Sequence, residues 1–113
     1  MARIGFGVAA AASLGFLVWF LVAHFERPGL SIGAALVGMP LLLSLFGLTK
    51  VSSSGITQDG KGAGWAAVAI AFLGVGYMAA FFYLSCGIVA GIWWLLHVPM
   101  IIGIVTSPTN KNP

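Results

Sequence analysis

GIVAGIWWLLHVPMIIGIV, residues 87–105, contains no charged side chain. A helix of this length extends for roughly 28 Å, because each residue adds about 1.5 Å, and this is close to the hydrocarbon thickness of a bilayer. We therefore predict that the segment crosses a membrane as a helix.

The rest of the chain has the same apolar character. Of the 113 residues, 60% are hydrophobic and 6% are charged, and the mean hydropathy is +1.08. A water-soluble domain carries around 25% charged residues, because its surface must be wetted. The composition excludes a conventional soluble domain and predicts the lipid bilayer as the main surroundings.

The apolar residues fall into four stretches separated by polar breaks. We expect an all-α integral membrane protein, one membrane domain over residues 1–113, with transmembrane helices over 4–25, 30–48, 65–84 and 87–105 and a polar loop over 49–64. Residues 62–105 are uncharged and would measure roughly 66 Å as one helix, so the chain must turn within them. Ser85, Cys86 and Gly87 are the predicted turn, which makes the last two spans a tight helical hairpin. Pro40 predicts a kink in the second span, and the polar tail over 107–113 is expected to fray.

Small residues recur at a spacing of four, which places them on one face of a helix. In a bilayer such faces let helix backbones approach closely. The residues predicted to lie at helix contacts are Gly7, Ala11, Gly15, Ala34, Gly38, Gly87, Gly91 and Gly103.

The positive charges predict the orientation of the chain. Four crossings put Arg3, Lys50, Lys61 and Lys111 on one side and Arg27 on the other. By the positive-inside rule both termini are cytoplasmic, or stromal or matrix in an organelle, which fits a prokaryotic inner membrane or an organellar membrane such as the thylakoid. The cations are too scattered for nucleic-acid binding. Nucleotide binding is not expected either, because Gly62 stands where the GITQDGKG segment, residues 55–62, would need a hydroxyl.

The predicted spans contain two histidines, His24 at the end of the first and His97 near the middle of the last. A polar group at that depth is costly unless it is hydrogen-bonded or ligated. Our main expectation is a neutral imidazole bonded to a carbonyl or hydroxyl of a neighbouring helix, or to the Leu95 carbonyl that Pro99 leaves free. His24 is expected to be an interfacial polar residue, too far along the bundle to share a ligand with His97.

A second interpretation makes His97 a ligand of haem or chlorophyll. Trp93 and Trp94 lie one turn away along the same helix, and Gly74 and Gly76 are predicted to face His97 from the preceding span, which would leave space for a flat ring. A proton or substrate relay through His97 is the third interpretation.

The side chains missing from the spans bear on function. No Asp or Glu lies inside a predicted span, Cys86 is the one cysteine, and no catalytic or metal-binding motif is present. We therefore expect neither an enzyme nor a metal site. The predicted function is a small accessory subunit of a larger membrane complex, such as a respiratory or photosynthetic electron-transfer complex, with other transmembrane subunits as partners. The alternatives are a haem- or chlorophyll-binding subunit that uses His97, and a small oligomeric channel, transporter or holin-like pore.

Overall fold

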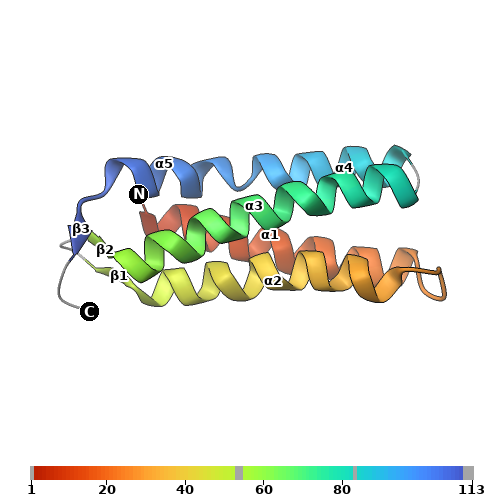
Figure 1. Ribbon diagram of the computed structural model, residues 1–113, viewed down its shortest axis with the longest axis horizontal. Coiled ribbons are helices and arrows are strands. Elements are labelled where there is room, and N and C mark those ends of the chain that lie inside the picture. The colour runs from red at the N-terminus through yellow and green to blue at the C-terminus, as the bar shows by residue number, and fades with distance from the viewer. Residues whose placement is uncertain (1, 53–54, 83, 111–113) are drawn as a thin grey trace.

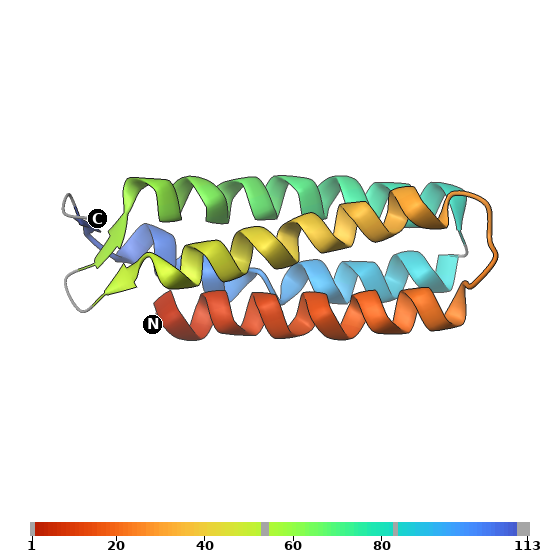
Figure 2. The same ribbon diagram turned by 90° about the horizontal axis from the view of Figure 1, so that it is seen from below.

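The protein is a bundle of four helical spans, and the computed structural model describes residues 2–52, 55–82 and 84–110 (Figures 1 and 2). The first three spans are α1 (Ala2–Ala23), α2 (Leu30–Thr49) and α3 (Gln58–Phe81), and the fourth is divided into α4 (Leu84–Leu95) and α5 (Val98–Thr106). The bundle measures 45 × 19 × 18 Å. Its length matches a bilayer with its headgroup regions, about 40–45 Å. Four helices long and apolar enough to cross a membrane indicate a multi-pass membrane protein.

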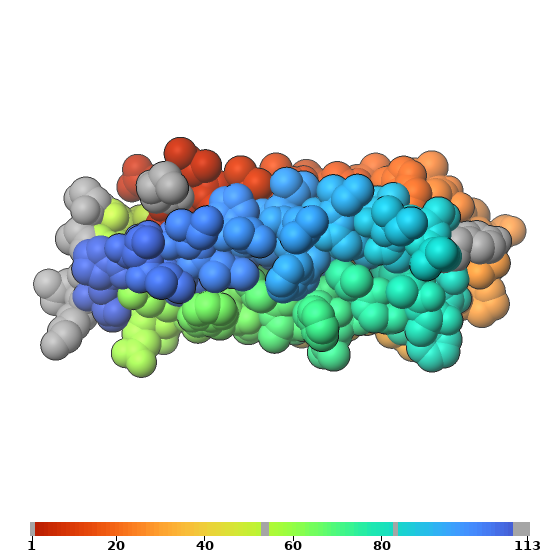
Figure 3. Space-filling view, turned by 90° about the horizontal axis from the view of Figure 1, so that it is seen from above, coloured from red at the N-terminus to blue at the C-terminus, as the bar shows by residue number. Residues whose placement is uncertain are grey.

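The spans are arranged in a ring, in which α2 packs against α1 and α3 and the last span closes the ring. Figure 3 shows this last span between α1 and α3. Its two parts have different main neighbours, since α4 lies mostly against α3 and α5 mostly against α1. The last span therefore changes neighbour near its middle, at the break between α4 and α5.

Two clusters of buried side chains form the core. The cluster nearer the connection between α1 and α2 is rich in aromatic residues and consists of Phe16, Phe20, Val37, Ala71, Met78, Phe82, Cys86, Ala90 and Trp93. The cluster at the other end has smaller members, which are Ala2, Phe6, Ala9, Ile56, Ala67, Met100 and Ile104. Large apolar side chains such as Leu42 and Phe72, 67% and 65% exposed, cover the outside of the bundle. An apolar exterior over an apolar core is the arrangement that lipid requires, because hydrocarbon does not drive apolar side chains inward.

A small sheet covers the end of the bundle that holds the start of α1. Strand β1 (Val51–Ser52) pairs antiparallel with β2 (Gly55–Thr57), and β2 pairs in parallel with β3 (Thr109–Asn110). The sheet places Ile56, which is fully buried, over the smaller core cluster. Residues 109–110 of the polar tail thus form a strand, where the sequence predicted fraying.

The third span begins earlier than the sequence predicts. The Thr57 hydroxyl accepts a hydrogen bond from the Gly60 N–H at 3.1 Å, which is an N-cap, so residues 58–64 of the predicted loop are helical. Gly60 and Gly64 are buried there, because their missing side chains make room for neighbours such as Ile56 and Phe6.

The predicted position of the turn between the last two spans is wrong. Helix α3 ends at Phe81 and α4 begins at Leu84, so Ser85, Cys86 and Gly87 form the first turn of α4. Gly87 is small because a Cβ there would lie 2.9 Å from the Cβ of Ala79 on α3. Its role is close helix packing rather than turn formation. Tyr83 lies outside the described residues.

Candidate functional site

The fourth span is interrupted at Leu96 and His97, between α4 and α5. Pro99 has no N–H, so it cannot donate to the Leu95 carbonyl as a helical residue would. The His97 N–H donates to the Trp94 carbonyl at 2.9 Å, which tightens the end of α4, and the His97 carbonyl accepts from the Ile101 N–H at 3.1 Å as α5 begins. By contrast, α2 continues through the buried Pro40 as one helix.

The His97 side chain takes the place of its own backbone N–H. In an unbroken helix that N–H would donate to the Trp93 carbonyl, and here Nδ1 of the imidazole lies 3.1 Å from this oxygen. A carbonyl only accepts, so Nδ1 carries a proton in this contact, and in a neutral imidazole Nε2 then keeps the lone pair. The predicted partner, a group on a neighbouring helix or the Leu95 carbonyl, is wrong, because the imidazole bonds to the Trp93 carbonyl, which the break releases from the His97 N–H.

The imidazole of His97 is fully buried among the spans. The Trp93 indole meets it edge to face, with ring centroids 5.3 Å apart and an interplanar angle of 87°. Nε2 has no hydrogen-bond partner within the part of the chain that the structure describes. In the neutral form of the ring, the nitrogen left unpaired is an acceptor and not a donor.

Trp93 connects the break to two other helices. Its Nε1–H donates to the Ser13 hydroxyl of α1 at 2.9 Å, with both side chains buried. Its ring centroid lies 5.0 Å from that of Phe16, with the two ring planes tilted by 32°. The ring also lies against Gly74 of α3, where an added Cβ would be 3.3 Å from the ring. Trp94 is half-buried and donates to the Val68 carbonyl of α3 at 3.3 Å. The two tryptophans therefore hold α4 to both neighbours.

The residues around His97 do not fit a haem or chlorophyll ring held inside the bundle. The space expected at Gly74 is filled by Trp93, and Gly76 faces outward with nothing within 4 Å of an added Cβ. The connection between α3 and α4 lies earlier in the sequence than predicted. The register of the last span against α3 is therefore shifted by about one helical turn. Because Gly74 is opposite Trp93, His97 lies level with Ile70 rather than with Val75.

The predicted small residues fall into two groups. Gly87 and Gly103 are buried at helix contacts, and a Cβ at Gly103 would lie 2.8 Å from Cα of Ala2. The others are half-buried or exposed. Four of these have nothing within 4 Å of an added Cβ, and they are Gly7, Gly15, Gly38 and Gly91.

Sequence reasoning missed the residues that bring α1 against α5. Gly5 is buried, and a Cβ on it would lie 2.5 Å from the Pro99 carbonyl oxygen and 2.7 Å from Cα of Met100. Gly5, Ala9 and Ser13 are also spaced by four, and this pattern was the signal that could have identified them.

An apolar groove of about 260 Å³ runs along the outside of the bundle between α1 and α4. It is lined by Ala12, Gly15, Phe16, Trp19, Val89, Ile92, Trp93 and Leu96. The change of neighbour at His97 explains the groove. Helix α4 packs mainly against α3, and α5 makes most of the contact with α1, so the space between α1 and α4 is not filled.

His24 is not part of this arrangement. It follows the end of α1, is buried, and lies between the rings of Phe20 and Phe82 at centroid distances of 5.1 and 5.3 Å. Across the described ranges, no group of three His, Cys, Asp or Glu side chains could hold a metal ion.

The chain matches no protein-family model, no curated protein and no solved structure in comparisons with known proteins. A function must therefore be inferred from the surfaces and contacts of the bundle itself.

Proposed function

We propose that this protein is a small accessory subunit of a larger membrane complex, such as a respiratory or photosynthetic electron-transfer complex. The observation that carries the proposal is an outer stripe of small residues on α1, formed by Gly7, Ala11 and Gly15. The two glycines have nothing within 4 Å of an added Cβ, and Ala11 is exposed. Within the described chain nothing covers this face.

The outer stripe is costly unless another helix packs on it. A glycine inside a helix is less favourable than alanine by about 1 kcal/mol. Lipid does not need a small residue, because acyl chains pack equally well against leucine. A second helix does need one, since close backbone approach is a main source of helix association in bilayers. The stripe is therefore best explained as the contact for a transmembrane helix of a partner subunit.

The groove between α1 and α4 extends this contact. Gly15 belongs both to the outer stripe and to the groove lining, so the two surfaces are continuous. The groove is lined almost entirely by apolar groups, which suits the branched side chains of a partner helix. The proposed interface thus combines a flat strip for close approach with a hollow for larger side chains.

The charges support one orientation in the membrane. Arg3, Lys50 and Lys61 belong to elements at the sheet end, and Arg27 belongs to the connection between α1 and α2 at the other end (Figure 1). We place the sheet end on the cytoplasmic side, or the stromal or matrix side of an organelle, by the positive-inside rule. Cysteine accessibility from the two sides of intact vesicles tests this placement.

Extraction in a mild detergent followed by native gel electrophoresis tests the proposed function. The wild-type protein should migrate in a large assembly with other chains. Ala11→Leu and Gly15→Leu should release it from the assembly, because a leucine holds the partner backbone away. Ala35→Leu is the matched control, since Ala35 is also exposed but lies on α2, and it should leave the assembly intact.

Two results would contradict the proposal. One is a wild-type protein that migrates only as a monomer. The other is an assembly made only of copies of this chain that conducts ions or solutes in liposomes, which would instead support the interpretation as an oligomeric pore.

A further inference from the structure

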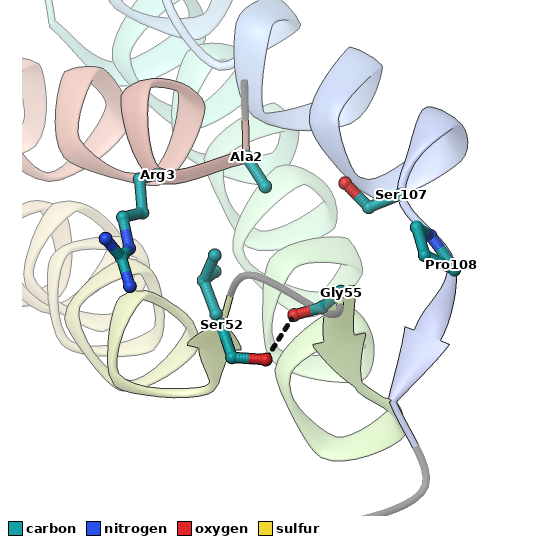
Figure 4. A pocket seen from close by; sticks show the side chains of 7 residues that line it. Ala2, Arg3, Ser52, Gly55, Ser107 and Pro108 are labelled. Atoms are coloured by element: carbon teal, nitrogen blue, oxygen red, sulfur yellow. Dashed lines mark hydrogen bonds between the residues drawn. The ribbon is translucent and has the colours of Figure 1, made fainter.

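A pocket of about 310 Å³ with both polar and apolar lining residues opens at the sheet end of the bundle, away from the interface proposed above (Figure 4). Three separate parts of the chain form it, namely the first turn of α1, the strands β1 and β2, and the residues that follow α5. Its lining residues are Ala2, Arg3, Val51, Ser52, Gly55, Ser107 and Pro108. We infer that this pocket binds a phosphate group at the depth of the lipid headgroups, with Arg3 as the principal contact.

The position of the pocket selects the ligand chemistry. It lies at one end of a 45 Å bundle, beside the short sheet and beyond the apolar part of the spans. In a bundle that crosses a bilayer, this end is at the level of the headgroups, where phosphate is the common anion. The inference rests on the bundle spanning the membrane and does not depend on any partner subunit.

The charge around the pocket favours an anion. Arg3 makes no hydrogen bond or ion pair with another described residue, and its planar guanidinium matches two oxygens of a phosphate. The chain has two acidic residues, and neither lines the pocket. Glu26 is in the connection at the opposite end of the bundle, and Asp59 is in the first turn of α3.

A second cation is fixed beside the pocket wall. The Lys61 ammonium donates to the Ser107 carbonyl at 2.7 Å and to the Thr109 hydroxyl at 3.0 Å. Because Ser107 is a lining residue, these bonds hold a positive charge next to the cavity. Lys61 therefore adds to the field of Arg3 from the other side of the opening.

The pocket also offers neutral donors and enough room. Figure 4 shows Arg3 on one side of the opening and the Ser107 hydroxyl on the other, pointing toward α1. The first N–H groups of α1, at Ala2 and Arg3, have no carbonyl partner within the helix and can add to the site. A water molecule in the liquid takes about 30 Å³, so the cavity has space for a phosphate with part of its ester substituent.

Titration of the full chain in detergent tests the inference. Phosphatidylglycerol, phosphatidylcholine and inorganic phosphate are added separately, and binding is followed by the rise in the thermal unfolding midpoint read from tryptophan fluorescence. Phosphatidylglycerol should bind the wild-type protein more tightly than phosphatidylcholine. Arg3→Gln should weaken phosphatidylglycerol binding about tenfold or more, because a charge-assisted bond is lost, and Arg3→Lys should recover part of it.

Lys50→Gln is the matched control. It removes one positive charge at the same end of the bundle, but Lys50 does not line the pocket and lies over the Phe46 ring, 5.4 Å from its centroid. Binding to Lys50→Gln should stay within about threefold of wild type, on the scale where tenfold is about 1.4 kcal/mol. Equal weakening in both variants, or no weakening in Arg3→Gln, would overturn the inference.

The titration with inorganic phosphate identifies the source of the ligand. Competition by millimolar inorganic phosphate with phosphatidylglycerol would assign the site to the phosphate group from any source. Binding of the lipid without such competition would assign it to a lipid headgroup. Without added lipid, Arg3→Gln and wild type should unfold at the same temperature, which separates a binding defect from a folding defect.

Discussion

The inner and outer faces of α1 carry the same pattern of small residues and have opposite surroundings. Gly5, Ala9 and Ser13 recur every fourth residue and are all buried. The outer stripe, Gly7, Ala11 and Gly15, has the same spacing two residues further along. A shift of two residues rotates the position by about 200° around a helix, which takes it to the opposite face. One stripe closes the bundle and the other is left uncovered by the described chain.

Small residues at a spacing of four therefore locate helix contacts without showing which helix is contacted. On the inner face, Gly5 meets the backbone at Pro99 and Met100, in the first turn of α5. The close approach of α1 to α5 is possible because there is no side chain between them. On the outer face, too, no large side chain blocks close approach, but the helix that approaches it must come from a partner subunit.

Replacing Gly5 and Gly7 by alanine in turn gives the largest expected difference between the faces. A Cβ on Gly5 would lie 2.5 Å from a backbone oxygen, and backbone cannot move aside as a flexible side chain can. We expect Gly5→Ala to lower the free energy of unfolding by about 3 kcal/mol, the upper part of the range for overpacking. Gly7→Ala should leave it unchanged or raise it by up to about 1 kcal/mol through helix propensity.

Thermal or SDS-induced unfolding of the two variants in the same detergent measures this difference. Each variant has one added methyl group on the same helix, so composition and detergent binding are matched. Equal stability of the two variants would show that the inner contact is not as close as the structure has it.

The bond between Ser13 and Trp93 gives a smaller expected effect on the inner face. Ser13→Ala leaves the Trp93 Nε1–H buried without its acceptor, which should cost about 1–2 kcal/mol. In Trp93→Phe the same serine substitution should cost less, so the double-mutant cycle should give a coupling energy of about 1 kcal/mol, within the range measured for bonds between membrane helices.

Trp94→Phe is the control for this cycle. Trp94 bonds to the Val68 carbonyl of α3, so its removal should not change the effect of Ser13→Ala. A Ser13 and Trp93 pair with no coupling would mean that their bond does not hold α1 to α4.

The four spans could be predicted from the sequence because they depend on local composition. The polar residues between His24 and Gly29 separate α1 from α2 in any arrangement of the helices, and the observed boundaries, Ala23 and Leu30, lie within about two residues of the predicted ones.

The early start of α3 could not be predicted in this way. Residues 58–64 contain three glycines, and they become helical because Thr57 caps them and because buried neighbours occupy the space beside Gly60 and Gly64.

The break at His97 shows a second limit of sequence reasoning. Pro40 and Pro99 both lie within apolar spans, yet α2 is continuous and the last span is divided. The difference comes from the surroundings, since Pro99 lies against Gly5 of α1 and His97 supplies a side-chain donor to the freed Trp93 carbonyl. The contact between Gly5 and Pro99 joins residues far apart in the sequence, so local sequence does not show it. Whether α2 bends at Pro40 stays a prediction.

Substitution of His97 tests whether the region facing the inner side of α1 depends on polarity or on shape. His97→Leu removes one bond to the Trp93 carbonyl, but that oxygen keeps the Leu96 N–H at 3.2 Å, and the change also removes a buried nitrogen that lacks a partner. These effects oppose each other, so we expect the free energy of unfolding to change by less than about 1 kcal/mol. His97→Ala leaves a cavity in a fully buried site and should cost about 2–4 kcal/mol. If leucine were as damaging as alanine in the same unfolding assay, the imidazole nitrogens rather than its volume would hold the break in place, and the close contact between Gly5 and Pro99 would depend on them.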